Sequence, residues 1–148
     1  MIEALPDDVV DSIVVGPVAS GRRARSVGVV SGPPAAGPVT ITLKAFPWVA
    51  LPNAARGVSR GVGMDMDDAG FSYPGDLAPD EEPVDGVLVY NPLGEATVSI
   101  PAFERLMLRY FRALITGAER LHDSVVEEPW WPEFVAATEE IEGRVSPA

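Results

Sequence analysis

The fold of this chain is decided by residues 86–106, which read GVLVYNPLGEATVSIPAFERL. Two runs of β-favouring residues, 86–90 and 95–98, are separated by residues 91–94, which include a proline and a glycine. Such a spacing predicts a β-hairpin. Ser99 then stands where a helix N-cap is expected, and the proline two residues later costs no hydrogen bond in the first turn of a helix. The stretch therefore predicts a hairpin that leads directly into a helix.

Two helices are predicted after the hairpin, at about 100–116 and about 131–142. In both segments the apolar residues recur at spacings of three and four, which is typical of a helix with one buried face. In the first helix these positions are Phe103, Leu106, Met107, Tyr110, Leu114 and Ile115. In the second they are Phe134, Val135, Thr138 and Ile141.

The first sixty residues predict a β-rich half. Segments 9–15, 26–30 and 39–43 are rich in β-branched residues and bounded by Gly or Pro, as strands commonly are. A short helix is predicted at 53–56. With 148 residues, the chain has the usual size of one domain. We therefore predict a single α+β domain, with an antiparallel sheet of about five strands and the two C-terminal helices packed on one face.

Charge is concentrated in the middle of the sequence. Residues 61–104 contain ten acidic side chains and no Lys or Arg, whereas the whole chain has a net charge of −11. A chain this acidic repels nucleic-acid phosphates and anionic lipid surfaces, so binding to either is not expected. The first part of this stretch, residues 61–85, is polar and rich in turn-forming residues, and we interpret it as an acidic loop.

Few residues in the sequence are suited to catalysis. There is no cysteine, which excludes thiolate metal sites and cysteine nucleophiles, and the only histidine, His122, lies in a polar stretch that favours a solvated or capping role. Neither a G-x-S-x-G turn nor a P-loop occurs. We therefore expect no enzymatic activity and no cofactor.

Two further observations bear on the environment of the protein. The first eight residues, MIEALPDD, carry acids where a signal peptide has basic residues. No apolar run approaches the roughly 18 residues that a membrane span requires. We therefore expect a cytoplasmic protein.

The acidic segment is the candidate binding site, because carboxylates without neighbouring cations repel one another and favour a positively charged partner. The alternative is that they only keep a loop soluble. The aromatic residues beside them have two interpretations, as anchors for a partner or as ties to the core. The candidate residues are Asp65, Asp67, Asp68, Phe71, Tyr73, Asp76, Asp80, Glu81, Glu82, Asp85, Trp130 and Trp131.

The run 91–106 resembles the strand, turn and capped helix of small bacterial immunity proteins, the antidotes of contact-dependent inhibition and other polymorphic toxin systems. The resemblance covers about residues 86–142. It implies an acidic, cytoplasmic α+β protein that binds one cognate toxin domain, often a nuclease, and blocks its active site or its access to substrate. The family has no shared catalytic motif, so the resemblance assigns no residue.

The function predicted from the sequence is therefore that of an immunity protein, which binds and neutralises a cognate, basic toxin domain of the nuclease type through an acidic surface. Two alternatives remain open. One is a metal-dependent protein or enzyme that uses the carboxylates of Asp65, Asp67 and Asp68, since oxygen ligands suit calcium or magnesium. The other is a secretion chaperone or dimeric structural subunit that binds through the apolar face of a helix.

Overall fold

The computed structural model describes residues 2–17, 28–76, 78–80 and 85–145. The helices are α1 (Asp7–Asp11), α2 (Gly37–Lys44), α3 (Leu51–Arg60), α4 (Ile100–Arg120) and α5 (Trp131–Val145). The strands are β1 (Glu3–Ala4), β2 (Val14–Pro17), β3 (Gly28–Ser31), β4 (Met64–Met66), β5 (Ala69–Ser72), β6 (Val87–Asn91) and β7 (Gly94–Val98). Short 3-10 turns occupy 34–36, 48–50, 74–76 and 124–127. The α+β class and the single domain are confirmed.

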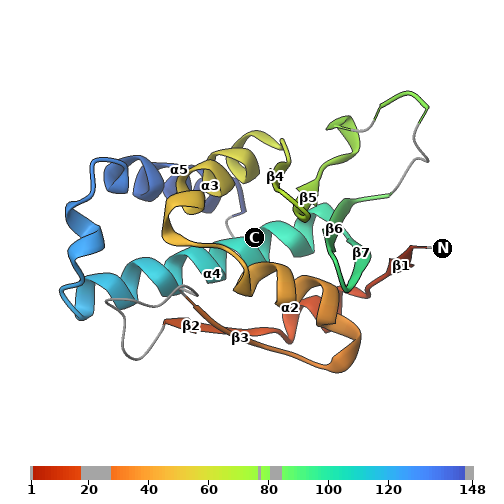
Figure 1. Cartoon of the computed structure of the whole chain (residues 1–148), viewed down its shortest axis with the longest axis horizontal. Coiled ribbons are helices and arrows are strands. Elements are labelled where there is room, and N and C mark those ends of the chain that lie inside the picture. The colour runs from red at the N-terminus through yellow and green to blue at the C-terminus, as the bar shows by residue number, and fades with distance from the viewer. Residues whose placement is uncertain (1, 18–27, 77, 81–84, 146–148) are drawn as a thin grey trace.

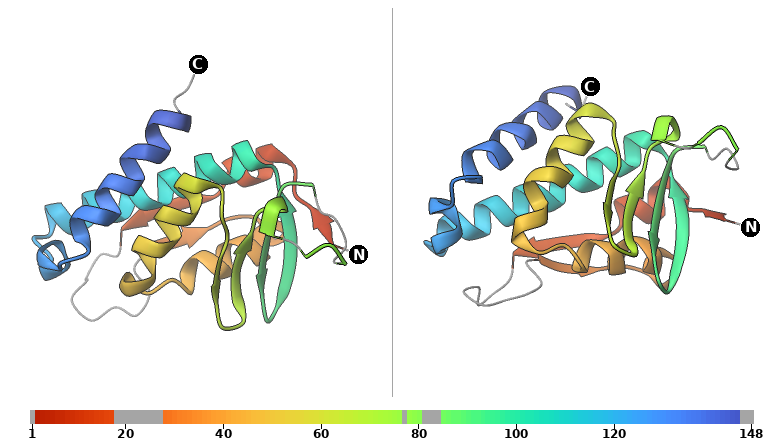
Figure 2. Two further views of the ribbon diagram at one scale, coloured as in Figure 1. Left: turned by 90° about the horizontal axis from the view of Figure 1, so that it is seen from above. Right: turned by 45° about the horizontal axis from the view of Figure 1, so that its top comes forward.

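Five strands form the main sheet in the order β1-β7-β6-β5-β4, and β2 and β3 form a separate antiparallel pair. The predicted hairpin is the β6–β7 unit, in which Asn91 pairs with Gly94 across a turn of two residues. Strands β4 to β7 are antiparallel, but β1 runs parallel to β7 and makes the sheet mixed. Figure 2 shows α2, α3, α4 and α5 on one side of this sheet.

Helix α4 runs through the centre of the molecule (Figure 1) and organises its core. Ser99 caps it as predicted, since its hydroxyl accepts a hydrogen bond from the Ala102 N–H at 3.2 Å. The apolar face predicted for this helix is buried, and the Phe103 ring lies 5.0 Å from the Phe71 ring of β5. The chaperone alternative requires this face to be open to a partner. The chain itself already covers it, so it is not available.

Two strands predicted in the first sixty residues are wrong. Segment 39–43 belongs to helix α2, where the Thr42 hydroxyl donates to the Pro38 carbonyl four residues earlier at 2.8 Å. The Asn91 side-chain amide also donates to the Pro38 carbonyl at 2.8 Å, so contacts with β6 outweigh the β preference of Val, Ile and Thr. Segment 9–15 is divided between α1 and β2.

Other elements differ from the prediction in extent. The short helix expected at 53–56 is α3, which spans ten residues, and the strand expected at 26–30 is seen as β3, with residues 26 and 27 outside the described part of the chain. The acidic loop expected at 61–85 contains the β4–β5 hairpin. No helix in the described ranges is long and apolar enough to cross a membrane.

Candidate functional site: the acidic outer face of the sheet

The main sheet has two unlike faces, which follow from the alternation of side chains along each strand. In β6, Val87, Val89 and Asn91 are buried toward the helices, whereas Leu88 and Tyr90 point the other way and are half-buried. We call this second face, with Asp65, Tyr90 and Glu95, the outer face. Among the described residues it carries no helix (Figure 2).

A row of four residues crosses the outer face in register. Asp65 pairs with Gly70, Gly70 with Tyr90, and Tyr90 with Glu95. The Tyr90 hydroxyl reaches over Gly70 and donates to the Asp65 carboxylate at 3.0 Å. A Cβ at Gly70 would lie 2.2 Å from the Met64 carbonyl oxygen and 3.0 Å from the Tyr90 hydroxyl, so only glycine fits beneath this bond.

A shallow pocket of about 230 Å³ lies beside this row and is lined by Asp65, Ser72, Asp76 and Tyr90, among others. The Asp76 carboxylate accepts hydrogen bonds from the N–H groups of Gly63 and Tyr73, each at 2.7 Å. It thereby joins the end of β5 to the start of β4. Asp76 therefore has a structural role at the edge of the acidic face.

The carboxylates of the outer face and its two ends have no cationic partner in the described part of the chain. Every ion pair there joins an arginine of α3, α4 or α5 to an acid of α1, α4 or α5. Asp67 and Asp68 form the exposed β4–β5 turn, and Asp80 and Asp85 are exposed at the opposite end of the sheet. The result is a negative surface whose carboxylates are not paired with the arginines of the helices.

The aromatic residues predicted beside the acids lie in the core. Phe71 is 1% and Tyr73 4% exposed, and the Tyr73 hydroxyl donates to Glu104 at 2.9 Å. Trp131 is 6% exposed and packs on Trp48. The structure therefore favours the core alternative for Phe71, Tyr73 and Trp131.

The remaining candidates are placed as follows. Trp130 is half-buried against Trp131 at the start of α5, at the far end of the molecule from residues 74–76 (Figure 1). Glu81 and Glu82 lie outside the described residues. Of the predicted site residues, the outer face and its two ends therefore carry only aspartates among the described residues: Asp65, Asp67, Asp68, Asp76, Asp80 and Asp85.

Two residues of the outer face, Tyr90 and Glu95, were not predicted as site residues. They flank the predicted β6–β7 turn as a cross-strand pair, so their proximity follows from the hairpin. The position of Tyr90 beside Asp65 could not be predicted, because it depends on the unrecognised β4–β5 hairpin. The missed signal was the Asp67–Asp68 pair between two short alternating runs, where Asp67 adopts a φ of 59° that aspartate tolerates in turns.

The structure also bears on the metal alternative and on the role of His122. In the described ranges no three Asp, Glu, His or Cys side chains come close enough together to hold a metal ion. Asp65 lies within β4, whereas Asp67 and Asp68 occupy the following turn. His122 is exposed just after α4, with a φ of 51°, in agreement with the solvated or capping role expected for it.

All three tyrosines are expected to resist ionisation in the folded protein. Burial, followed by the hydrogen bond to Asp65, raises the pKa of Tyr90 to about 12. Burial also raises the pKa of Tyr73, with a further contribution from Glu104, and that of Tyr110. An unfolded tyrosine has a pKa of about 10. The raised pKa values therefore stabilise the folded state in full below that pH, and this stabilisation is lost as the pH rises through the folded values.

Absorbance at 295 nm will therefore show almost no tyrosinate in the native protein at a pH where the protein in denaturant is largely ionised. Tyr90→Phe should remove the tyrosine ionisation step that has the lowest midpoint pH. A native titration with a midpoint at the ordinary tyrosine value would contradict the arrangement around Tyr90.

Comparisons with protein-family models, with curated proteins and with solved structures gave no match.

Proposed function

We propose that this protein binds a basic protein domain through the acidic outer face of its sheet and acts as the immunity protein of a toxin. The observation that supports the proposal is the segregation of charge. In the described part of the chain the carboxylates at the two ends of the sheet lack cationic partners, whereas five arginines of the helices are paired with other acids: Arg56, Arg105, Arg109, Arg112 and Arg144. An uncompensated patch of one sign accelerates association with an opposite patch and selects against wrong partners.

The shape of the face agrees with a protein partner. The β4–β5 turn with Asp67 and Asp68 lies at one end of the sheet, and Asp80 and Asp85 lie at the other, so the charges border a half-buried centre formed by Leu88 and Tyr90. Aromatic and apolar side chains surrounded by a polar rim are typical of protein interfaces. A toxin that acts on nucleic acid presents a basic substrate-binding surface, and the acidic face would cover it.

The proposal is tested by expressing this chain together with the products of neighbouring genes and purifying complexes at low and moderate salt. A basic partner that is lethal alone and harmless with this protein would support it. Growth that is never rescued, with no basic partner captured, would contradict it.

The charge dependence of binding gives a second, quantitative test. Replacing Asp67 and Asp68 with asparagine removes two charges from the face, and asparagine tolerates the turn conformation of Asp67. We expect the association rate with the partner to fall by about tenfold at low salt and the difference to shrink at high salt.

The matched control is the E139Q/E140Q variant, which removes the same charge from exposed positions on α5. Its association rate should stay close to that of the parent protein in stopped-flow measurements. Equal rates for the two variants at low salt would rule out the outer face as the steering surface.

A further inference from the structure

The tips of two hairpins lie side by side at one end of the main sheet. The antiparallel register of β5 with β6 places the β4–β5 turn and the β6–β7 turn at the same end (Figure 2). The first turn consists of Asp67 and Asp68 and the second of Pro92 and Leu93, and all four residues are exposed. We call these four residues the hairpin tips. An apolar tip therefore lies beside an acidic one.

Leu93 is 80% exposed, the highest value among the exposed large apolar residues in the described part of the chain. A single exposed leucine is common on protein surfaces and indicates nothing by itself. Its meaning depends on whether the turn requires a leucine, on how firmly the turn is held, and on which charges lie near it.

The β6–β7 turn does not require a leucine. Two-residue hairpin turns favour residues with positive φ, as in Asn-Gly, because such turns match the twist of the two strands. The neighbouring turn contains such a residue, Asp67, with a φ of 59°. Neither Pro92 nor Leu93 has a positive φ, and proline cannot adopt one. The backbone therefore gains nothing from this pair, and such departures from local preference are expected where residues serve function.

The turn is held from inside by Asn91, a polar residue at a core position of β6. Asn91 is 8% exposed, and its amide donates to the Pro38 carbonyl at 2.8 Å and to the Thr42 hydroxyl at 3.0 Å. Its side-chain oxygen accepts the Leu93 N–H at 2.9 Å. Contacts with α2 thus fix the backbone that carries Leu93. A side chain on a fixed turn costs less ordering entropy on binding than one on a mobile loop.

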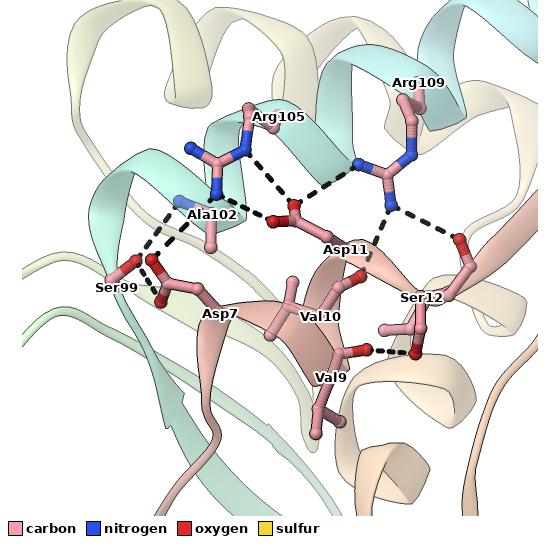
Figure 3. Close-up of polar contacts among 10 residues, drawn as sticks. Asp7, Val9, Val10, Asp11, Ser12, Ser99, Ala102, Arg105 and Arg109 are labelled. Atoms are coloured by element: carbon pink, nitrogen blue, oxygen red, sulfur yellow. Dashed lines mark hydrogen bonds and ion pairs between the residues drawn. The ribbon is translucent and has the colours of Figure 1, made fainter.

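The charges of this end of the sheet are not neutralised by the chain. Asp67, Asp68 and Glu95, which follows Leu93 by two residues, are exposed and make no ion pair within the described ranges. Helix α1 is different, because its Asp11 pairs with Arg105 of α4 at 3.0 Å (Figure 3). The apolar tip therefore has unpaired carboxylates near it, which favour a cationic counterpart.

We infer that Leu93 is the apolar anchor of the interface with the basic partner and enters an apolar recess whose rim carries arginine or lysine. This inference rests on the proposed function and narrows its interface to the hairpin tips. A buried apolar contact inside a polar ring is the usual arrangement of a binding hot spot. A second copy of this chain is disfavoured as the occupant, because it would bring like charges together.

The anchor has a kinetic signature that separates it from the charges around it. Leu93→Ala should raise the dissociation rate of the complex by about tenfold or more and leave the association rate close to that of the parent protein. Removing the charges of Asp67 and Asp68 should mainly slow association. Stopped-flow association and surface plasmon resonance measure the two rates, and a parent-like dissociation rate for Leu93→Ala would overturn the inference.

Two controls separate binding from folding. Val49→Ala truncates another large apolar residue, 73% exposed in the 3-10 turn before α3, and should leave both rates unchanged. Leu93→Met keeps the apolar volume and should retain most of the affinity. Circular dichroism should show the same unfolding midpoint for Leu93→Ala as for the parent protein. A loss of affinity as large in Val49→Ala as in Leu93→Ala would refute a specific role for the hairpin tips.

The surface can also be tested before the partner is known, by photo-crosslinking of the full chain in the cells that produce it. Benzoylphenylalanine at position 93 should form one crosslinked product, whereas the same group at position 49 should form none. The captured protein should be basic, and replacing Asp67 and Asp68 with asparagine should reduce the yield. No product at position 93, or the same product from both positions, would contradict the inference.

The two proposals fail separately. If a lethal basic partner is neutralised by this protein but dissociates from Leu93→Ala at the parent rate, the anchor is wrong and the proposed function stands. If position 93 captures one basic protein in a charge-dependent way, and that protein is harmless when expressed alone, the immunity function is wrong and the docking surface stands.

Discussion

Replacing Phe103 with alanine is expected to lower the free energy of unfolding by about 3–5 kcal/mol, the usual cost of removing a buried phenylalanine ring. Phe103 is 1% exposed, and its ring centre lies 5.0 Å from that of Phe71 and 6.1 Å from that of Tyr73. These contacts attach β5 and the residues after it to α4. The loss should therefore be felt by the sheet that carries the acidic face.

The loss can be measured by guanidinium denaturation followed by circular dichroism. Leu93→Ala is a suitable control, because Leu93 is also a large apolar residue but is 80% exposed in the β6–β7 turn. It should change the stability by less than about 0.5 kcal/mol. Similar losses for the two variants would mean that Phe103 does not hold the sheet on the helix.

Replacing Arg144 with alanine is expected to cost about 2–4 kcal/mol, because it leaves a buried carboxylate without its cation. The Arg144 guanidinium donates to the Glu104 carboxylate at 2.6 Å and to the Val58 carbonyl at 2.5 Å, and it also bonds the Ser59 carbonyl. Glu104 is 8% exposed, and among the described residues it keeps only the Tyr73 hydroxyl as a partner in the variant. One side chain thus joins α3, α4 and α5.

Arg112→Ala is the matched control for Arg144→Ala. Arg112 pairs with Glu142 on the surface at 2.5 Å, and Glu142 is largely exposed, so this pair should contribute less than about 1 kcal/mol. Both variants remove one arginine that links two helices. Thermal unfolding of the two should therefore differ clearly, and an equal shift would show that water replaces the contacts of Arg144.

The parts of the fold that could be predicted are those governed by local signals. The capped helix α4, helix α5 and the β6–β7 hairpin follow from spacing, a cap and a turn within a few residues of each other. Residues 39–43 are the opposite case: their β-branched composition predicts a strand, but Asn91, far along the chain, binds the helical backbone at Pro38. The β propensity of these five residues does not take account of a contact with a residue so distant in sequence.

The candidate site was predictable in its charge but not in its geometry. The sequence indicates that residues 61–104 are acidic, and the exposed aspartates of the outer face agree with that. Which aromatic residues lie near them depends on the strand register. Tyr90 is brought to Asp65 by two successive strand pairings, whereas Phe71, one residue after Gly70, necessarily points to the core.

The parallel pairing of β1 with β7 has a consequence for how the protein folds. Glu3 pairs with Ala96, so this edge of the sheet is closed by a strand that is synthesised much earlier than its neighbour. Contacts between residues far apart in sequence slow folding, because a long loop must be ordered before they form. On the ribosome the first residues must wait until β7 has emerged, so this edge of the sheet is completed after the β6–β7 hairpin.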